Sequence, residues 1–211
     1  MTNHLALIGD SILDNSPYVA PEPDTATHLQ RALGGSWVVD LLARDGSTMT
    51  DIRLQIGTLV TAADVAILSV GGNDAIDHIG ILEQRTTTTT ELLDQLQNVA
   101  EEFGARYRQV LDVLRPRVNR LAVCTIYEPP LTDPRTARLA RVPLSLLNDQ
   151  VVRTASSHGV DVLDLRAVCT EPSDFVREIE PSPIGARKIA AAIEALVRSP
   201  ITPSGARLFA V

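Results

Sequence analysis

Aromatic residues, cysteine and histidine are all scarce in this sequence of 211 residues. Phe, Trp and Tyr make up 3% of it, which leaves too few rings for a platform that stacks sugars or bases. The two cysteines, Cys124 and Cys169, lie in apolar contexts far apart in the chain, so we expect buried free thiols and no disulfide. There are four histidines and no Cys/His cluster at zinc spacing, so we expect neither a metal ion nor another cofactor.

Basic blocks and long apolar runs are also missing. The net charge is −7, and the 19 Lys and Arg residues are scattered, which makes nucleic acid a poor partner. No basic segment followed by a long apolar run opens the chain, so the sequence predicts neither a signal peptide nor a membrane span. We therefore expect a cytoplasmic protein that acts on a small molecule and has no membrane partner.

What the chain does contain is a regular alternation of short apolar runs and amphipathic segments. Strands are predicted at residues 5–8, 37–43, 65–70, 121–126 and 160–165, and helices at 25–33, 50–59, 91–114, 136–157 and 183–197. The helix over 136–157 is expected to be interrupted before Pro143, because proline disfavours helical geometry in the residue ahead of it.

This alternation predicts a single α/β domain over residues 1–199, in which helices cover both faces of a five-stranded, mostly parallel sheet. Residues 200–211 are expected to form a C-terminal tail that is either a loose extension or packs on a neighbouring molecule. A homodimer is one arrangement that such a tail allows.

The stretch LALIGDSILDN, from Leu5 to Asn15, carries the first candidate for chemistry. Its apolar run ends at Gly9, and Ser11 follows two residues later, as expected where a buried strand delivers a hydroxyl to the carboxyl edge of a parallel sheet. Gly9 permits a tight turn, and Asp10 or Ser11 can cap the next helix. A strand, a turn and a helix with a capping serine would give the same pattern, so this stretch alone leaves both interpretations open.

Two more polar turns follow predicted strands. Gly46 comes after the second strand and Gly72 and Asn73 come after the third, so all are expected at the same sheet edge as Ser11. A serine hydroxyl, backbone N–H groups and an asparagine amide at one edge can surround a carbonyl oxygen. This is the arrangement that an oxyanion hole for acyl transfer requires.

The motifs GDSILDN, DGST and GGND, in this order and spacing, resemble the first three blocks of the SGNH (GDSL) hydrolase superfamily, and the resemblance extends from Leu5 to about Val197. It implies a flavodoxin-like three-layer α/β/α sandwich with serine esterase, lipase or acyltransferase chemistry. It also implies that Ser11 is the nucleophile, and that the Ser11 N–H, the Gly46 N–H and the Asn73 side chain form the oxyanion hole.

The last motif of the superfamily, Asp-x-x-His followed by proline, is not matched. Aligning its proline with Pro181 puts Glu180 where the catalytic histidine belongs and Arg177 where the aspartate belongs. Because a serine hydroxyl is a weak nucleophile without an adjacent base, the departure bears directly on function.

Three explanations of this departure stay open. In the first, Glu180 is the base, provided that partial burial raises its pKa toward neutrality, with Glu178 as the fallback carboxylate. In the second, another histidine is recruited, and His78 is the best candidate because it follows the GGND turn. In the third, the scaffold binds a carbonyl or carboxylate compound, or catalyses a cyclisation or rearrangement, without acylating Ser11.

Our leading expectation is an esterase or acyltransferase that acts on a small acyl ester, with Ser11, Gly46, Asn73 and Glu180 as its catalytic residues. Further polar residues near the same edge are expected to contact the substrate, with hydrogen bonding within loops as the alternative for some of them. They are Asp10, Asn15, Tyr18, Gly72, His78, Tyr127 and Arg177.

Overall fold

A six-stranded parallel sheet forms the centre of the computed structural model, which describes residues 2–59, 62–200 and 206–210. The strands run in the order β2-β1-β3-β4-β5-β8 across the sheet. They are β1 (Asn3–Gly9), β2 (Trp37–Leu41), β3 (Ala63–Ser69), β4 (Val118–Cys124), β5 (Asp161–Leu163) and β8 (Leu208–Phe209). The predicted α/β class and the parallel sheet are confirmed, but the sheet has six strands instead of five.

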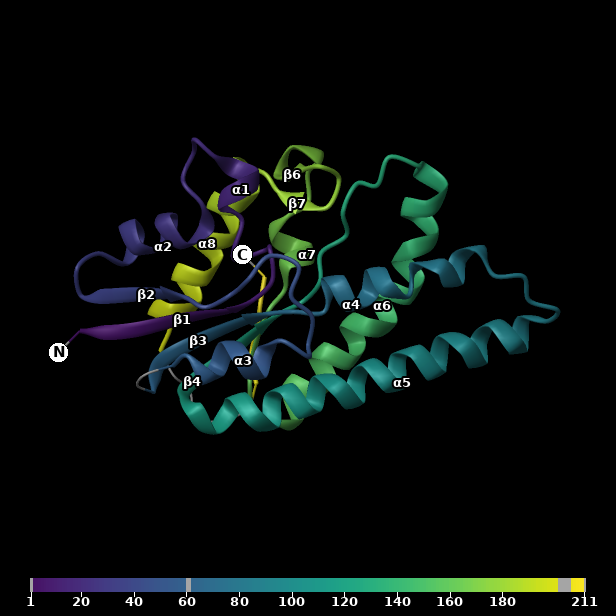
Figure 1. Ribbon diagram of the computed structural model, residues 1–211, viewed down its shortest axis with the longest axis horizontal. Coiled ribbons are helices and arrows are strands. Elements are labelled where there is room, and N and C mark those ends of the chain that lie inside the picture. Colours follow the sequence, from purple (N-terminus) through teal and green to yellow (C-terminus); the bar gives the residue numbers. More distant parts are fainter. Residues whose placement is uncertain (1, 60–61, 201–205, 211) are drawn as a thin grey trace.

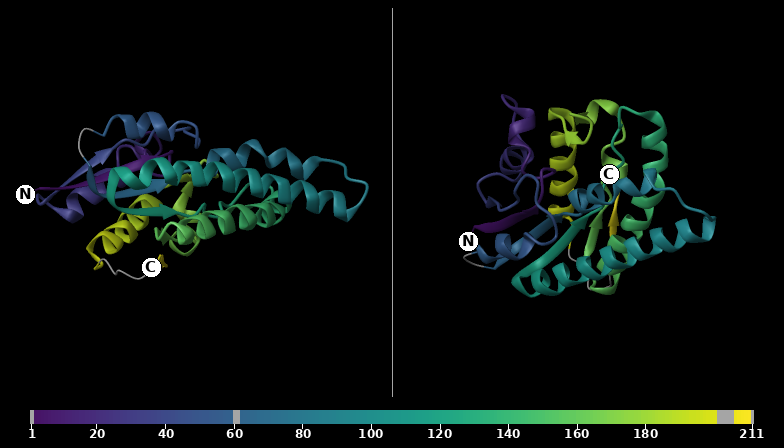
Figure 2. Two further views of the ribbon diagram at one scale, coloured as in Figure 1. Left: turned by 90° about the horizontal axis from the view of Figure 1, so that it is seen from below. Right: turned by 45° about the vertical axis from the view of Figure 1, so that its right-hand side comes forward.

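Helices cover both faces of this sheet (Figures 1 and 2). On one face lie α3 (Ile52–Gly57), α5 (Thr89–Leu114) and α6 (Pro134–Ser157), and on the other lie α2 (Thr25–Leu33), α7 (Leu165–Val168) and α8 (Pro183–Arg198). The result is the three-layer sandwich that the sequence predicts.

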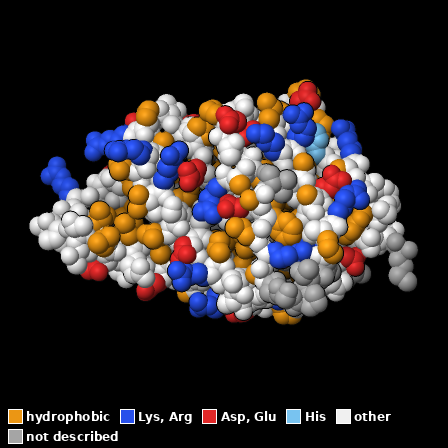
Figure 3. Space-filling view, turned by 180° about the vertical axis from the view of Figure 1, so that it is seen from behind, with side chains coloured by type: hydrophobic (Ala, Val, Ile, Leu, Met, Phe, Trp, Pro, Cys, Tyr) orange, Lys and Arg blue, Asp and Glu red, His pale blue; other side chains and the backbone are white. Residues whose placement is uncertain are grey.

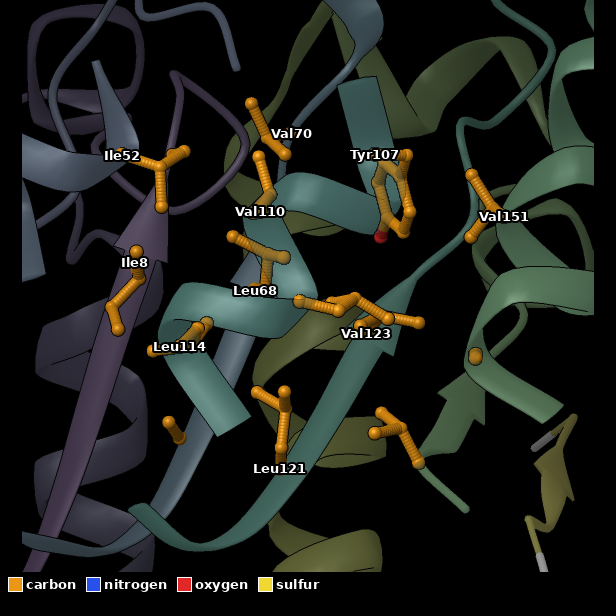
Figure 4. Close-up of a cluster of buried hydrophobic side chains, with 14 of the residues drawn as sticks. Ile8, Ile52, Leu68, Val70, Tyr107, Val110, Leu114, Leu121, Val123 and Val151 are labelled. Atoms are coloured by element: carbon orange, nitrogen blue, oxygen red, sulfur yellow. The ribbon is translucent and has the colours of Figure 1, made fainter. Parts of the chain in front are cut away.

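The strands are apolar on both sides because both faces are covered. In β1, Leu5 and Leu7 face the cluster that α2 and α8 complete, whereas Ala6 and Ile8 face the cluster under α3, α5 and α6. Figure 4 shows the second cluster, in which Ile8 and other strand residues meet side chains of α5. Full burial of a side chain such as Ile8 stabilises the fold by about 1.5–3 kcal/mol.

Helix α6 runs without interruption through Pro143, so the predicted break is wrong. A proline inside a helix removes one backbone hydrogen bond and crowds the preceding turn. Helix α6 nevertheless lies along α5 and buries Leu147, Val151 and Ala155 in the core (Figure 1). Tertiary packing therefore outweighs the local cost of Pro143.

Several short elements escaped prediction because they are too short to show a period. They are α1 (Ser16–Val19), α4 (Gly72–Asp77), the 3₁₀ helices η1 (Ile79–Glu83), η2 (Arg115–Arg117) and η3 (Pro172–Asp174), and the antiparallel hairpin of β6 (Phe175–Val176) and β7 (Glu180–Pro181).

The expected C-terminal tail contributes the edge strand β8. Leu208 pairs with Val162 of β5, and the adjoining Arg207 forms an ion pair of 2.7 Å with Asp161. This part of the tail thus packs on its own chain. Positions 201–205 and 211 of the tail lie outside the described residues.

Cys124 and Cys169 are buried and free, as predicted. On the face seen in Figure 3, basic and acidic side chains are interspersed with hydrophobic ones, without one large field of either sign. Within residues 2–59, 62–200 and 206–210, none of the helices combines the length and the apolarity that a membrane crossing needs.

Candidate active site

The ends of β1, β2 and β3 are joined directly at the carboxyl edge of the sheet. The Asp10 N–H donates to the carbonyl oxygen of Ser69 at 3.0 Å, and the Arg44 N–H donates to the carbonyl oxygen of Gly9 at 2.9 Å. These bonds bring together the turns that carry Ser11, Gly46 and Asn73, as the sequence led us to expect.

Gly9 is required where β1 leaves the sheet. Its φ of 137° lies in a region that side chains disfavour, and a Cβ atom there would come within 1.7 Å of the Ser69 carbonyl oxygen. The close approach of the two backbones therefore depends on glycine, and it delivers Ser11 to the sheet edge.

Asn73 connects the third turn to the second. One N–H of its side-chain amide donates to the carbonyl oxygen of Ser47 at 2.9 Å, next to Gly46, whose φ is 77°. Since a primary amide has two N–H donors, the second one is not used by this bond. Asn73 lies at the start of α4 and lines a pocket that is described below.

The neighbouring Asp74 supports this arrangement from inside the protein. Its carboxylate accepts hydrogen bonds from the Met49 N–H at 3.1 Å and from the Arg106 guanidinium at 2.7 Å. Burial raises the pKa of Asp74, and these two partners lower it. Asn73 and Asp74, the two residues after Gly72, thus both hold the loop that carries Gly46.

Glu180 lies on the short strand β7, beside Ser11. The two residues are each 9% exposed and both line the pocket described below, although no hydrogen bond joins their side chains within the described residues. Burial raises the pKa of Glu180 above its ordinary range, and Asp45 raises it further, whereas the nearby Ser11 hydroxyl and the Arg177 charge lower it. Its Oε2 atom is buried and has no hydrogen-bond partner within the described residues.

A pocket of about 150 Å³ opens beside these groups. Asp10, Ser11, Gly72, Asn73 and Glu180 line one end of it. The remaining wall is mostly aliphatic and comes from α4, η1, the first half of α5, the segment 126–131 and the first half of α6. Among the residues that the structure describes, no group of His, Cys, Asp or Glu side chains could hold a metal ion.

A family model described as "GDSL-like Lipase/Acylhydrolase family" matches residues 7–188. The chain belongs to this family. A search of curated protein sequences finds no match.

Solved structures with a similar fold include lipases and esterases. An extracellular lipase from Streptomyces rimosus is 15% identical with a TM-score of 0.65, and the alignment covers 94% of this chain and 100% of the lipase. A phospholipase A1 from Streptomyces albidoflavus is 16% identical with a TM-score of 0.67 at 94% and 100% coverage. A mutant of Axe2, an acetyl-xylooligosaccharide esterase from Geobacillus, is 18% identical with a TM-score of 0.68 at 96% and 97% coverage.

The hairpin that carries Glu180 in this GDSL-like protein is tightly constrained. Arg177 and Glu178 have φ values of 49° and 69°, a left-handed conformation that is uncommon outside glycine. Tyr127 fixes the hairpin from the other side, because its hydroxyl donates to the Ile179 carbonyl and its ring meets the Phe175 ring edge-on at 4.9 Å. Tyr127 also lines the pocket.

Asp10 faces the same end of the pocket and is 2% exposed. Its Oδ1 atom accepts a hydrogen bond of 3.2 Å from the Ile12 N–H, so the side chain braces the turn around Ser11. Burial raises the pKa of Asp10 to about 8, and the nearby charge of Glu180 contributes to the rise. At neutral pH this carboxyl group is therefore mostly protonated.

His78 and Glu178, the other two candidates for the base, are placed differently. His78 caps the end of α4 and lines the pocket, and within the described residues no hydrogen bond joins its ring to Asp77, nor either His78 or Glu180 to Ser11. Glu178 is exposed and accepts a hydrogen bond from the Thr132 N–H at 2.9 Å.

Three residues expected to bind substrate lie outside the pocket lining. Both ends of the Asn15 side-chain amide bond to Thr25 at 3.0 Å, which fixes the loop after Ser11. The Tyr18 hydroxyl donates to Asp45 at 2.7 Å, and the Arg177 guanidinium lies 5.2 Å from the centre of the Tyr18 ring. These interactions hold loops in place, which is the alternative that the sequence left open, and they include one negative charge (Asp45) and one positive charge (Arg177) that act on Glu180.

Gln55 and the helical wall of the pocket were not expected from the sequence. Gln55 bonds to Gly9 and to Ser47, and no local pattern marks it as different from any other helical glutamine. The sequence does contain a pattern that indicates the helical wall, because Ala137, Ala140 and Leu144 repeat at the spacing of one helix face.

Proposed function

We propose that this protein is a serine ester hydrolase in which the Glu180 carboxylate serves as the general base in place of histidine. The observation that carries the proposal is that Ser11 and the buried Glu180 carboxyl group line the same pocket, where burial raises the pKa of Glu180 and the nearby Ser11 hydroxyl lowers it. A base must come within hydrogen-bonding reach of the proton it removes once the substrate is bound, and its pKa must be near the working pH.

In the first half of the reaction, Ser11 Oγ attacks the carbonyl carbon of the ester and its proton passes to Glu180. The oxyanion that forms is stabilised by the N–H groups of Ser11 and Gly46 and by the second N–H of Asn73. Protonated Glu180 then gives the proton to the departing alkoxide, which leaves as the alcohol and an acyl-Ser11 ester remains. Each proton that Glu180 accepts is thus returned within the cycle.

In the second half, Glu180 removes a proton from the acceptor that attacks the acyl group, and Ser11 recovers its own proton as the product acid leaves. With water as the acceptor the reaction is hydrolysis, and with an alcohol it is acyl transfer. Adding an alcohol acceptor and measuring the ratio of new ester to free acid distinguishes the two activities.

The environment of Glu180 supports its assignment as a base in three ways. Burial destabilises the charged form and makes the carboxylate a stronger base. The Oε2 atom lacks a donor among the described residues that would stabilise the charge. The neighbouring Asp10 carboxyl is neutral at pH 7, so it does not place a second negative charge beside the oxyanion.

The test is labelling with a fluorophosphonate probe over a pH series, on wild type and on four variants. We expect no labelling of Ser11→Ala, and a rate lower by about 10²–10⁴ in Glu180→Gln, which is the range for loss of general-base catalysis. Glu178→Gln is the matched control, because it makes the same change two residues away on an exposed side chain, and its rate should equal that of wild type.

The remaining variant is His78→Ala, and it should still be labelled. Loss of labelling in His78→Ala alone would move the base to that histidine. A folded wild type that is unlabelled at every pH would refute Ser11 as the nucleophile, and would favour a protein that binds or rearranges a carbonyl compound on this fold.

A further inference from the structure

The pocket extends from Ser11 into a region that lies beyond the sheet. Helix α4, η1 and the first turns of α5 project past the carboxyl ends of the strands, and the first half of α6 lies beside them (Figures 1 and 2). Residues from all of these elements line the pocket. This apolar arm of the pocket is continuous with the groups around Ser11.

One helix face supplies much of the wall of the apolar arm. Ala137, Ala140, Leu144 and Leu147 of α6 lie at intervals of three and four residues, and all four line the pocket. Two of them are alanines, so the backbone of α6 comes close to the space and leaves room for a ligand.

Facing this stripe are aliphatic side chains of η1 and α5. Ile81 and Leu82 belong to η1, and Leu96 and Val99 belong to α5. These eight side chains present only hydrocarbon to the pocket.

Away from Ser11 the pocket lining has few polar side chains, which are those of His78, Tyr127, Glu128 and Arg141. Glu128 and Arg141 form an ion pair of 3.0 Å with each other, and both side chains reach solvent. Tyr127 is the one aromatic side chain among the described lining residues other than His78, and its hydroxyl already donates to Ile179. A sugar placed here would find few partners to replace its hydrogen bonds to water, and the Tyr127 ring, which is 4% exposed and packs edge-on against Phe175, leaves little face for it to stack on.

We propose that the apolar arm binds the aliphatic acyl chain of the substrate, so that the protein prefers esters of fatty acids longer than acetate. This inference rests on the proposed function, since it places the acyl carbonyl at Ser11 and the chain between η1, α5 and α6. Each methylene buried in the arm should raise kcat/KM by about fourfold, as its transfer out of water predicts. The gain should stop once the chain fills the arm.

The first experiment measures kcat/KM for p-nitrophenyl acetate, butyrate, octanoate and decanoate. Wild type should prefer octanoate over acetate. Ala140→Phe places a ring in the arm and should lower the octanoate-to-acetate ratio by more than about tenfold, since it excludes several methylene groups. Val142→Phe, at a position 57% exposed on the same helix and outside the lining, is the matched control and should keep the wild-type ratio.

Two further variants keep the test valid if Ala140→Phe fails to fold. Ala137→Phe fills the arm from the preceding turn of α6 and should lower the same ratio. Leu96→Ala enlarges the arm from α5 and should shift the preference toward decanoate. Equal rates for acetate and octanoate in wild type, or an unchanged ratio in both filled variants, would overturn the proposal.

Binding of decanoate to Ser11→Ala, followed by calorimetry, separates this inference from the proposed function because it needs no chemistry. We expect decanoate to bind Ser11→Ala and to bind the double variant with Ala140→Phe at least about tenfold more weakly. Decanoate binding with this pattern in a protein that hydrolyses no ester would refute the hydrolase and keep the acyl site. Hydrolysis of p-nitrophenyl acetate without decanoate binding would support the hydrolase and refute the acyl site.

Discussion

The side-chain amide of Gln55 brackets Gly9 with two hydrogen bonds of 2.8 Å, one accepted from the Gly9 N–H and one donated to its carbonyl oxygen. The same amide donates to the Ser47 hydroxyl at 3.0 Å. Gln55 is 6% exposed, so these bonds are shielded from water. Helix α3 thereby joins the end of β1, which delivers Ser11, to the loop that carries Gly46.

Replacing Gln55 with methionine removes all three bonds while keeping a side chain of similar size. We expect the free energy of unfolding to fall by about 2–4 kcal/mol, because buried polar groups left without partners cost about 1–3 kcal/mol each. We also expect a lower kcat at similar KM, since Ser11 and Gly46, the proposed nucleophile and one proposed oxyanion donor, lose their common support. Urea unfolding and ester kinetics measure the two effects.

The matched control for this prediction is Gln97→Met on the exposed side of α5, which should change stability by less than about 0.5 kcal/mol. Equal effects of the two substitutions on stability and kcat would contradict a positioning role for Gln55.

Asp10 makes the stability of the protein depend on pH. Burial raises its pKa in the folded protein to about 8 from an ordinary value of 3.8. Between these values the folded state holds a proton that the unfolded state has released, so stability must fall as pH rises from about 4 to about 8, and this contribution levels off above that range. Asp10→Asn should flatten the slope, because asparagine stays neutral and can still accept the bond from Ile12.

Urea midpoints measured across this pH range, with Asp14→Asn as the comparison, test the assignment. Asp14 accepts a single bond of 3.0 Å from the Asp45 N–H, and its replacement should leave the slope in place. A slope that persists in Asp10→Asn would place the responsible group elsewhere.

Two charges of opposite sign near Glu180 should move the pH profile of activity in opposite directions. The proposed mechanism requires the carboxylate form of Glu180, so we expect kcat/KM to rise with pH as Glu180 loses its proton. Arg177 lowers the pKa of Glu180 and Asp45 raises it. Arg177→Met should therefore shift the rising limb to higher pH, and Asp45→Asn should shift it to lower pH.

Asp45 also accepts the hydroxyl bond of Tyr18, so Tyr18→Phe serves as the control that removes the bond and keeps the charge. The pH at which kcat/KM rises should change less in Tyr18→Phe than in Asp45→Asn. If the pH profiles of all these variants coincide with that of wild type, Glu180 does not control the rise.

The meeting of the three turns was predictable because it depends on local requirements. An apolar run followed by a glycine specifies where a buried strand ends, and parallel strands must end at the same edge. Gly9 illustrates this, since its contact with Ser69 tolerates no side chain. The position of Glu180 was predictable from its spacing to the proline before the last helix.

The surroundings of Glu180 were not predictable, because they depend on contacts between distant parts of the chain. Strands of two residues show no period, and the hairpin of β6 and β7 is fixed by Tyr127, whose partner Ile179 is 52 residues away in sequence. The apolar arm has a similar origin. Its stripe on α6 is visible in the sequence, but only the packing shows that it faces α5 and η1.

The edge strand β8 depends on a buried charge cluster that gives the last prediction. Asp161 is 7% exposed and pairs with Arg120 at 3.0 Å and with Arg207 at 2.7 Å. Asp161→Asn leaves the buried Arg120 guanidinium without its counter-charge, and breaking such a pair from one side costs about 3–5 kcal/mol. Asp149→Asn, which breaks the exposed pair with Arg153, should cost less than about 0.5 kcal/mol.

Urea unfolding compares the two asparagine variants directly, and limited proteolysis reports on the end of the chain. Because Arg207 leads into β8, Asp161→Asn should also make the C-terminal residues more accessible to a protease, whereas Asp149→Asn should not. Similar unfolding midpoints and cleavage rates for both variants would show that β8 is held by its pairing with β5 alone and not by the charges of Asp161 and Arg207.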